Sequence, residues 1–71
     1  MDNAQFTEVG RVKVSDTTDI VVSRVTENGE LMGLSINKWV ATKRFTGFVR
    51  GAMVPKDKVG ELVKLLQKGG E

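Results

Sequence analysis

Apolar and polar residues alternate along the chain up to about residue 54, and Val and Ile are frequent at the apolar positions. A period of two is typical of β-strands with one buried face. After Pro55 the apolar residues follow the spacing of one helix face instead. These residues are Val59, Leu62, Val63 and Leu66. The pattern predicts an α+β fold, a curved four-stranded antiparallel sheet followed by one C-terminal helix.

The alternation and the turn residues give approximate element bounds. Strands are expected at about 6–15, 20–27, 30–41 and 44–54, and the helix at about 56–67. Together they form one domain, because 71 residues are too few for two. Residues 1–5 are expected to be a short disordered N-terminus, and residues 68–71 a flexible tail.

The pair Asn28-Gly29 sets the register of the two middle strands. Asn-Gly favours a two-residue hairpin turn, because both turn residues take a positive φ. The pairs that follow are Val25 with Met32, Ser23 with Leu34, and Val21 with Ile36. A hairpin closed around Thr42-Lys43 and a four-residue loop at 16–19 extend this register to the outer strands.

This register sorts the strand residues onto two faces. One face is almost entirely apolar and is expected to form the core: Val12, Val14, Val21, Val25, Met32, Leu34, Ile36, Val40, Phe45, Val49 and Met53. The other is basic, polar and aromatic: Arg11, Lys13, Arg24, Ser35, Asn37, Trp39, Thr46, Phe48 and Arg50. Lys38 falls on the apolar side, which predicts a bulge near the end of its strand. Gly33, Gly47 and Gly51 indicate strong curvature or the close approach of a ligand.

The size of the chain bears on its assembly. A domain this small buries only about 60% of its unfolded surface and needs a disulfide, a metal or a partner subunit. The absence of Cys excludes a disulfide, and the absence of His as well argues against a structural zinc site. We therefore expect a homodimer and no metal or cofactor. Its expected interface is the widened helix stripe Val59, Leu62, Leu65 and Leu66.

The same composition argues against an enzyme. Without His, Cys or Tyr, the chain lacks the usual general acids and bases and the thiol nucleophile, so no catalytic residue is assigned. Phosphate-binding glycine motifs are missing too, and no small-molecule substrate is expected. No apolar run reaches the ~20 residues that span a bilayer. We expect a cytoplasmic protein, of a bacterium or of a phage-infected cell.

Charge is distributed unevenly along the chain, although the net charge is only +2. Between Glu30 and Asp57 there is no acidic residue, but there are five basic ones: Lys38, Lys43, Arg44, Arg50 and Lys56. Such segregation is typical of surfaces that bind polyanions. Basic residues that merely keep strand surfaces soluble are the alternative explanation.

The second face carries the groups that single-stranded nucleic acid requires. Cations bind the phosphates, and aromatic rings stack on the bases for roughly 1–3 kcal/mol each. Trp39 and Phe48 are expected close together, with Arg24 and Arg50 beside them. The complete set of predicted nucleic-acid-binding residues consists of the nine residues of this face together with Lys43 and Arg44, which lie at the hairpin between the last two strands. A half-buried Trp39 folded over a sheet edge is the structural alternative.

Three segments resemble the transcriptional coactivator family called positive cofactor 4. They are Asn28-Gly29 with the strand that ends at Trp39, then residues 50–55, and finally residues 59–66. The resemblance covers about residues 6–67. It implies a dimer formed through the helices and single-stranded DNA bound on the opposite sheet surface. It places Trp39 and Arg50 at DNA-contact positions.

The chain also departs from that family. Glu27 stands where some members have an aromatic residue, and Val59 where relatives often have one. A serine-rich regulatory tail is missing, so regulation of coactivation is not implied. The resemblance suits a compact prokaryotic or phage member that supports replication, recombination or transcription.

The predicted function is sequence-tolerant binding of single-stranded DNA. RNA binding uses the same surface and stays open. A protein-interaction module, with Trp39 and Phe48 as its hot spot, is the alternative from another class, because Trp and Arg are enriched at such sites. Salt separates these functions, since phosphate binding weakens steeply with added salt.

Overall fold

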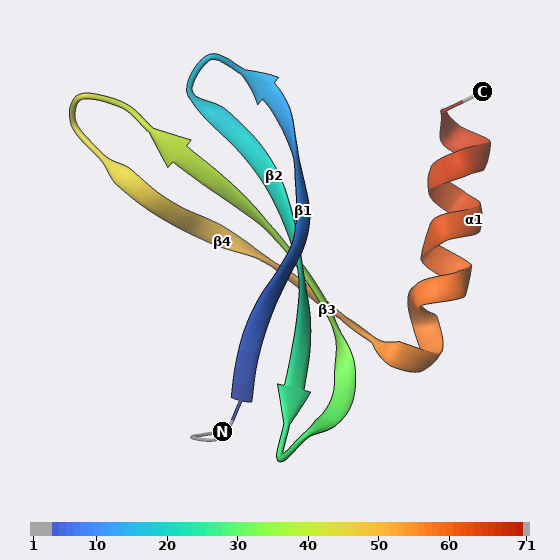
Figure 1. Ribbon diagram of the computed structural model, residues 1–71. Helices are drawn as coiled ribbons and strands as arrows, with labels where there is room; N and C mark the ends of the chain where they lie inside the picture. Colours follow the sequence, from blue (N-terminus) through green and yellow to red (C-terminus); the bar gives the residue numbers. More distant parts are fainter. Residues whose placement is uncertain (1–3, 71) are drawn as a thin grey trace.

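The computed structural model describes residues 4–70 and has four strands and one helix (Figure 1). In chain order these are β1 (Ala4–Ser15), β2 (Thr18–Glu27), β3 (Glu30–Ala41), β4 (Thr46–Pro55), a short 3₁₀ turn η1 (Lys56–Lys58) and α1 (Val59–Gly69). The strands form one antiparallel sheet in the order β1-β2-β3-β4. The predicted α+β architecture is confirmed.

Both ends of the chain are more regular than the sequence indicates. Ala4 and Gln5 belong to β1 rather than to a disordered N-terminus, and Lys68 and Gly69 belong to α1 rather than to a tail. The other residues of those expected flexible ends, 1–3 and 71, lie outside the described residues, and Gly70 forms a turn after α1.

The turn between β2 and β3 forms as predicted, but the expected register extends only to its first residues. Asn28 and Gly29 take φ angles of 55° and 82°, and Glu27 pairs with Glu30. A register shift follows at once, because Met32 is an extra residue on β3 and Val25 pairs with Gly33 instead. Beyond the bulge, each residue of β2 pairs with a residue of β3 one position further along than predicted. Because side chains alternate between the two faces, the predicted faces of the two strands no longer match.

The bulge overturns part of the predicted division into two faces. Ser23 pairs with Ser35, and Val22 rather than Val21 pairs with Ile36. Since directly paired residues share a face, Val21 and Val25 lie on the face of Trp39 and not on the opposite, aliphatic one. Met53 joins them, because it pairs with Ser35. Arg24 pairs with Leu34 and lies on the aliphatic face.

Both outer hairpins close differently from the prediction. Ser15 pairs with Thr18, so the first turn has two residues rather than four. The last turn spans residues 42–45, and Thr42 closes it with three bonds to Phe45. Its N–H donates to the Phe45 carbonyl oxygen at 2.7 Å and its hydroxyl donates to the same oxygen at 3.1 Å, while the hydroxyl oxygen accepts from the Phe45 N–H at 3.0 Å. Phe45 is therefore an exposed turn residue and not part of a core. A hairpin closed around Thr42-Lys43 would pair Trp39 with Thr46, but Trp39 pairs with Phe48.

Two glycines lie where β3 and β4 approach each other closely. The register shifts between Ile36 and Lys38. This is the bulge predicted from the position of Lys38 on the apolar side of the strand. A Cβ on Gly51 would overlap the Ile36 carbonyl oxygen, and a Cβ on Gly33 would overlap that of Val54. Gly33 and Gly51 are therefore needed because the backbone of the neighbouring strand comes close to them, and not because a ligand does.

Little of the single chain is buried. Among residues 4–70, Val21 and Val25 are the buried hydrophobic side chains, 1% and 2% exposed. Expected core residues such as Val12 and Val14 are exposed instead. Within the described chain, no helix has both the length and the hydrophobicity that a bilayer crossing requires.

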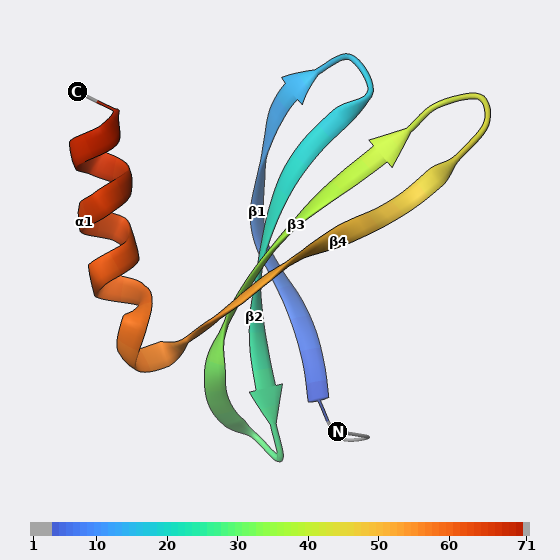
Figure 2. The same cartoon turned by 180° about the vertical axis from the view of Figure 1, so that it is seen from behind.

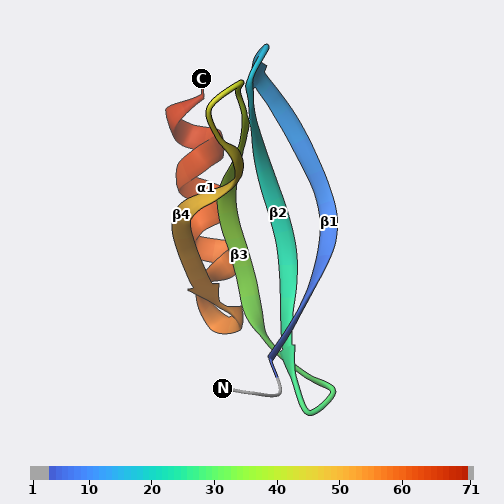
Figure 3. The same ribbon diagram turned by 90° about the vertical axis from the view of Figure 1, so that its left-hand side faces the viewer.

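The helix α1 stands beside the sheet, and none of its residues is buried (Figures 1 and 2). Seen from the side, it lies nearest β3 and β4 and away from β1 (Figure 3). An apolar groove of about 160 Å³ separates α1 from the sheet. It is lined by Val22, Leu34, Ile36, Val54, Val59, Leu62, Val63 and Leu66. We call this side of the sheet the helix face.

Candidate nucleic-acid interface

The opposite side of the sheet, which we call the Trp39 face, is built from rows of side chains that cross all four strands. One row contains Lys13, Asp19, Trp39 and Phe48. The next contains Arg11, Val21 and Asn37, with Arg50 beside the bulge on β4. A third contains Glu8, Ser23, Ser35 and Met53. The register thus brings aromatic, cationic and hydrogen-bonding groups onto one surface.

Trp39 and Phe48 form an aromatic pair in the first of these rows. Their ring centroids are 4.9 Å apart and their planes meet at 71°, an edge-to-face arrangement that aromatic rings favour. Trp39 is half-buried, and it does not fold over a sheet edge because β3 is an inner strand. Phe48 is 57% exposed. The pair therefore holds an aromatic ring open to solvent in a fixed orientation.

Arg11 lies on this face as predicted, but carboxylates already bind it. Its Nη2 and Nε donate to the two carboxylate oxygens of Glu8 at 2.8 and 3.0 Å, and its Nη1 donates to Asp19 at 3.2 Å. The bond to Glu8 is the largest effect that raises the pKa of Arg11, and the same bond lowers the pKa of Glu8. A phosphate would have to compete with both carboxylates for Arg11.

Other predicted cations keep their charge available. Within residues 4–70, no carboxylate forms an ion pair with Lys13, Arg50, Lys43 or Arg44. Lys13 shares a row with Trp39, and Arg50 borders a space on the same face together with Asn37 and Phe48. Lys43 and Arg44 are exposed in the turn between β3 and β4. Arg24 is exposed on the helix face, so it is not part of this interface.

The predicted polar residues occupy different positions. Thr46 is exposed at the start of β4, paired with Ala41. Ser35 is buried, and its hydroxyl oxygen accepts a bond of 3.4 Å from the Asn37 amide nitrogen. Ser35 therefore orients Asn37 rather than contacting a ligand itself.

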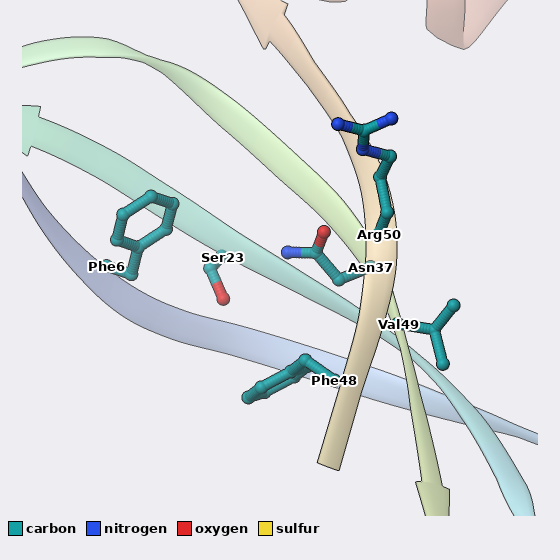
Figure 4. A pocket seen from close by; sticks show the side chains of 6 residues that line it. All are labelled: Phe6, Ser23, Asn37, Phe48, Val49 and Arg50. Carbon is teal, nitrogen blue, oxygen red and sulfur yellow. The ribbon is translucent and has the colours of Figure 1, made fainter.

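A cavity of about 450 Å³ opens on the Trp39 face (Figure 4). It is lined by Phe6, Ser23, Asn37, Phe48, Val49 and Arg50. Phe6 belongs to β1 and Phe48 to β4, so the sheet curls until its two edge strands border one space. Neither Phe6 nor Ser23 is among the predicted site residues, and the expected pairing with Leu34 places Ser23 on the core face; Ser23 pairs with Ser35 instead. Strict alternation from Arg11 places Phe6 on the opposite face, but a register shift between Glu8 and Gly10 brings it onto this one.

The chain matches no family model, no curated protein and no solved structure. Within residues 4–70, no group of three or more carboxylates lies where it could hold a metal ion. The geometry of the Trp39 face is therefore the basis for assigning a function.

Proposed function

We propose that the protein binds single-stranded DNA across the Trp39 face with little sequence preference. The observation that supports this most is the Trp39–Phe48 pair, which shares one face with the free cations Lys13 and Arg50. Stacking rings beside cations can hold bases and phosphates at once. The resemblance to the positive cofactor 4 family agrees with this use of Trp39 and Arg50. Such a protein would support replication, recombination or transcription of a bacterial or phage genome wherever single strands are exposed.

Single strands suit this surface better than a duplex. Bases in a duplex are already stacked on one another, so the open ring of Phe48 would have no base face to contact. Proteins that recognise duplex DNA commonly insert a helix into the major groove. Here α1 turns an apolar stripe toward the helix face of the sheet, on the side away from Trp39.

The proposal includes a homodimer formed through α1. Three of the four residues predicted for the interface, Val59, Leu62 and Leu66, line the groove between α1 and the sheet. The fourth, Leu65, is 66% exposed beside it. With only two buried hydrophobic side chains in the described chain, a second copy of α1 and its groove would supply the missing core.

We expect Trp39→Ala to weaken binding to an oligo(dT) strand by roughly 1–3 kcal/mol, the value of one stacked base. Anisotropy of a labelled oligonucleotide measures the affinity, and thermal melting checks that the variant is folded. A folded variant with unchanged affinity would contradict the proposal. Wild-type protein that binds neither DNA nor RNA strands would refute it entirely.

We expect Arg50→Ala to reduce the salt dependence of DNA affinity by about one phosphate contact. Arg24→Ala is the matched control, because it removes the same charge from the helix face. The measurement is the slope of log affinity against log salt concentration. Equal changes in both variants would mean that only net charge matters. Binding of an acidic protein through an aromatic hot spot, the competing function, predicts a nearly flat slope for the wild type.

A further inference from the structure

We propose that the cavity on the Trp39 face is a subsite for one unpaired nucleobase, which inserts between Phe6 and Phe48 and is recognised at its edge by Asn37. This inference rests on the proposed function and names the part of the ligand that the cavity binds. At about 450 Å³ the cavity lies within the roughly 300–1,000 Å³ of ligand pockets. Its lining is mainly apolar, with a few polar groups.

Two exposed rings border this space from the two edge strands, Phe6 from β1 and Phe48 from β4. Phe6 is 62% exposed and Phe48 is 57% exposed, although each is large and apolar. The edge contact with Trp39 holds Phe48 in place, at 4.9 Å between centroids. Figure 4 shows the side chains of Ser23 and Asn37 directed into the space beside the two rings. A flat aromatic ligand would cover both exposed rings together.

The polar groups of the cavity have free hydrogen-bonding capacity. Within residues 4–70, Asn37 donates one amide hydrogen to Ser35 and keeps its second amide hydrogen free. Its carbonyl oxygen lies against Gly51 of β4, where an added Cβ would overlap it, and in that part of the chain it accepts no hydrogen bond. The hydroxyl of Ser23 likewise has no partner there, and neither oxygen is sealed from solvent. An amide that can both donate and accept suits the edge of a base, as Asn does in recognising adenine.

The surroundings of the cavity fit a base that is attached to a strand. Figure 4 shows Arg50 at the rim, with its guanidinium directed away from the rings. A phosphate beside the inserted base would reach that cation without entering the cavity. Val21 and Val25, the buried hydrophobic side chains, flank the lining residue Ser23 in β2 and pack on the same face.

The test begins with Phe6→Ala and its control Val9→Ala, a residue of the same strand that is also 62% exposed but does not line the cavity. Affinity for oligo(dT) should fall roughly 5- to 150-fold in Phe6→Ala, the loss of one stack. Val9→Ala should bind as the wild type does. Phe6→Tyr should retain affinity and Phe6→Leu should not, because stacking needs the ring. An abasic strand should bind Phe6→Ala and the wild type equally.

A double-mutant cycle then tests whether one base contacts both rings. If Phe6 and Phe48 hold the same base, the double alanine variant loses less affinity than the two single losses combined. Losses that multiply independently would overturn the shared subsite. For Asn37, one amide at one subsite gives only a modest preference among oligo(dA), oligo(dC) and oligo(dT), and Asn37→Ala should bring these three affinities closer together. An unchanged ratio would overturn its role in recognising the base.

The two proposals fail in different ways. Suppose that the wild type binds single strands and that Trp39→Ala lowers the affinity, but that Phe6→Ala and Val9→Ala have the same affinity. The DNA-binding function then stands and the base subsite is wrong. If the wild type binds no strand at all, both are wrong. Because Phe6 is exposed, a large drop in melting temperature in Phe6→Ala would mark it as a packing residue and overturn the subsite.

Discussion

Replacing Gly33 with alanine should lower the free energy of unfolding by about 1–3 kcal/mol, the usual cost of forcing extra atoms into a packed site. The new Cβ would overlap the Val54 carbonyl oxygen and lie 3.0 Å from the Val54 carbonyl carbon and 3.1 Å from Pro55 Cα. All three are backbone atoms, so no side-chain rotation can relieve the contact. The strands β3 and β4 must separate where Gly33 pairs with Pro55.

Gly10→Ala is the control for this prediction. A Cβ at Gly10, in β1, meets no atom within 4 Å. Alanine there should leave stability unchanged or raise it slightly, because it narrows the conformations of the unfolded chain. Urea denaturation of both variants at one protein concentration gives the comparison, since association alters apparent stability. Equal stabilities for the two variants would show that β3 and β4 are not so closely apposed.

Local sequence signals sufficed for the elements of this fold. Alternation along 30–41 predicts β3 with its observed bounds, and Asn28-Gly29 predicts its turn. The change of period after Pro55 predicts the helix. Each signal depends on a few neighbouring residues, so one chain displays it without any knowledge of tertiary contacts.

Register could not be predicted in the same way. A single extra residue, Met32, reverses which residues of β2 share a face with Trp39. It moves Arg24 away from the site and brings Ser23 into it. Nothing in the local sequence marks Met32 as the extra residue, because a bulge depends on packing across several strands.

The ion pairs of Arg11 show the same limit. Residues three apart in a regular strand, such as Glu8 and Arg11, point to opposite faces. The register shift at Val9 places both on the Trp39 face, where Arg11 donates two bonds to Glu8. Sequence reasoning therefore counted Arg11 as a free cation, whereas the structure shows that it is bound.

Leu65→Asp should separate the proposed dimer into monomers or unfold the protein. Leu65 is 66% exposed in the single chain, so an aspartate there would stay largely in water within one subunit. Any large effect must therefore come from a second molecule. Lys64→Ala is the matched control, because it makes the same change in net charge on the neighbouring polar side of α1.

The size of the expected effect follows from symmetry and burial. A two-fold interface uses the same patch of both subunits, so one substitution places two carboxylates at the contact. Burying an unpaired charge costs several kcal/mol, comparable with the roughly 5 kcal/mol that stabilises a small domain. The apolar groove along Val22, Ile36 and Leu62 would then lose the helix that covers it and face water.

Sedimentation equilibrium decides the outcome, because the monomer has a mass of 7.8 kDa and the dimer twice that. The wild type and Lys64→Ala should sediment as dimers at micromolar concentration, and Leu65→Asp should not. The affinity of Leu65→Asp for a long DNA strand should also fall. In a dimer, binding at one Trp39 face raises the effective concentration of the strand at the other face, and a monomer loses this advantage. A short strand that reaches only one face should lose much less if the variant remains folded. A wild type at the monomer mass, or a Leu65→Asp dimer as stable as the wild type, would refute assembly through α1.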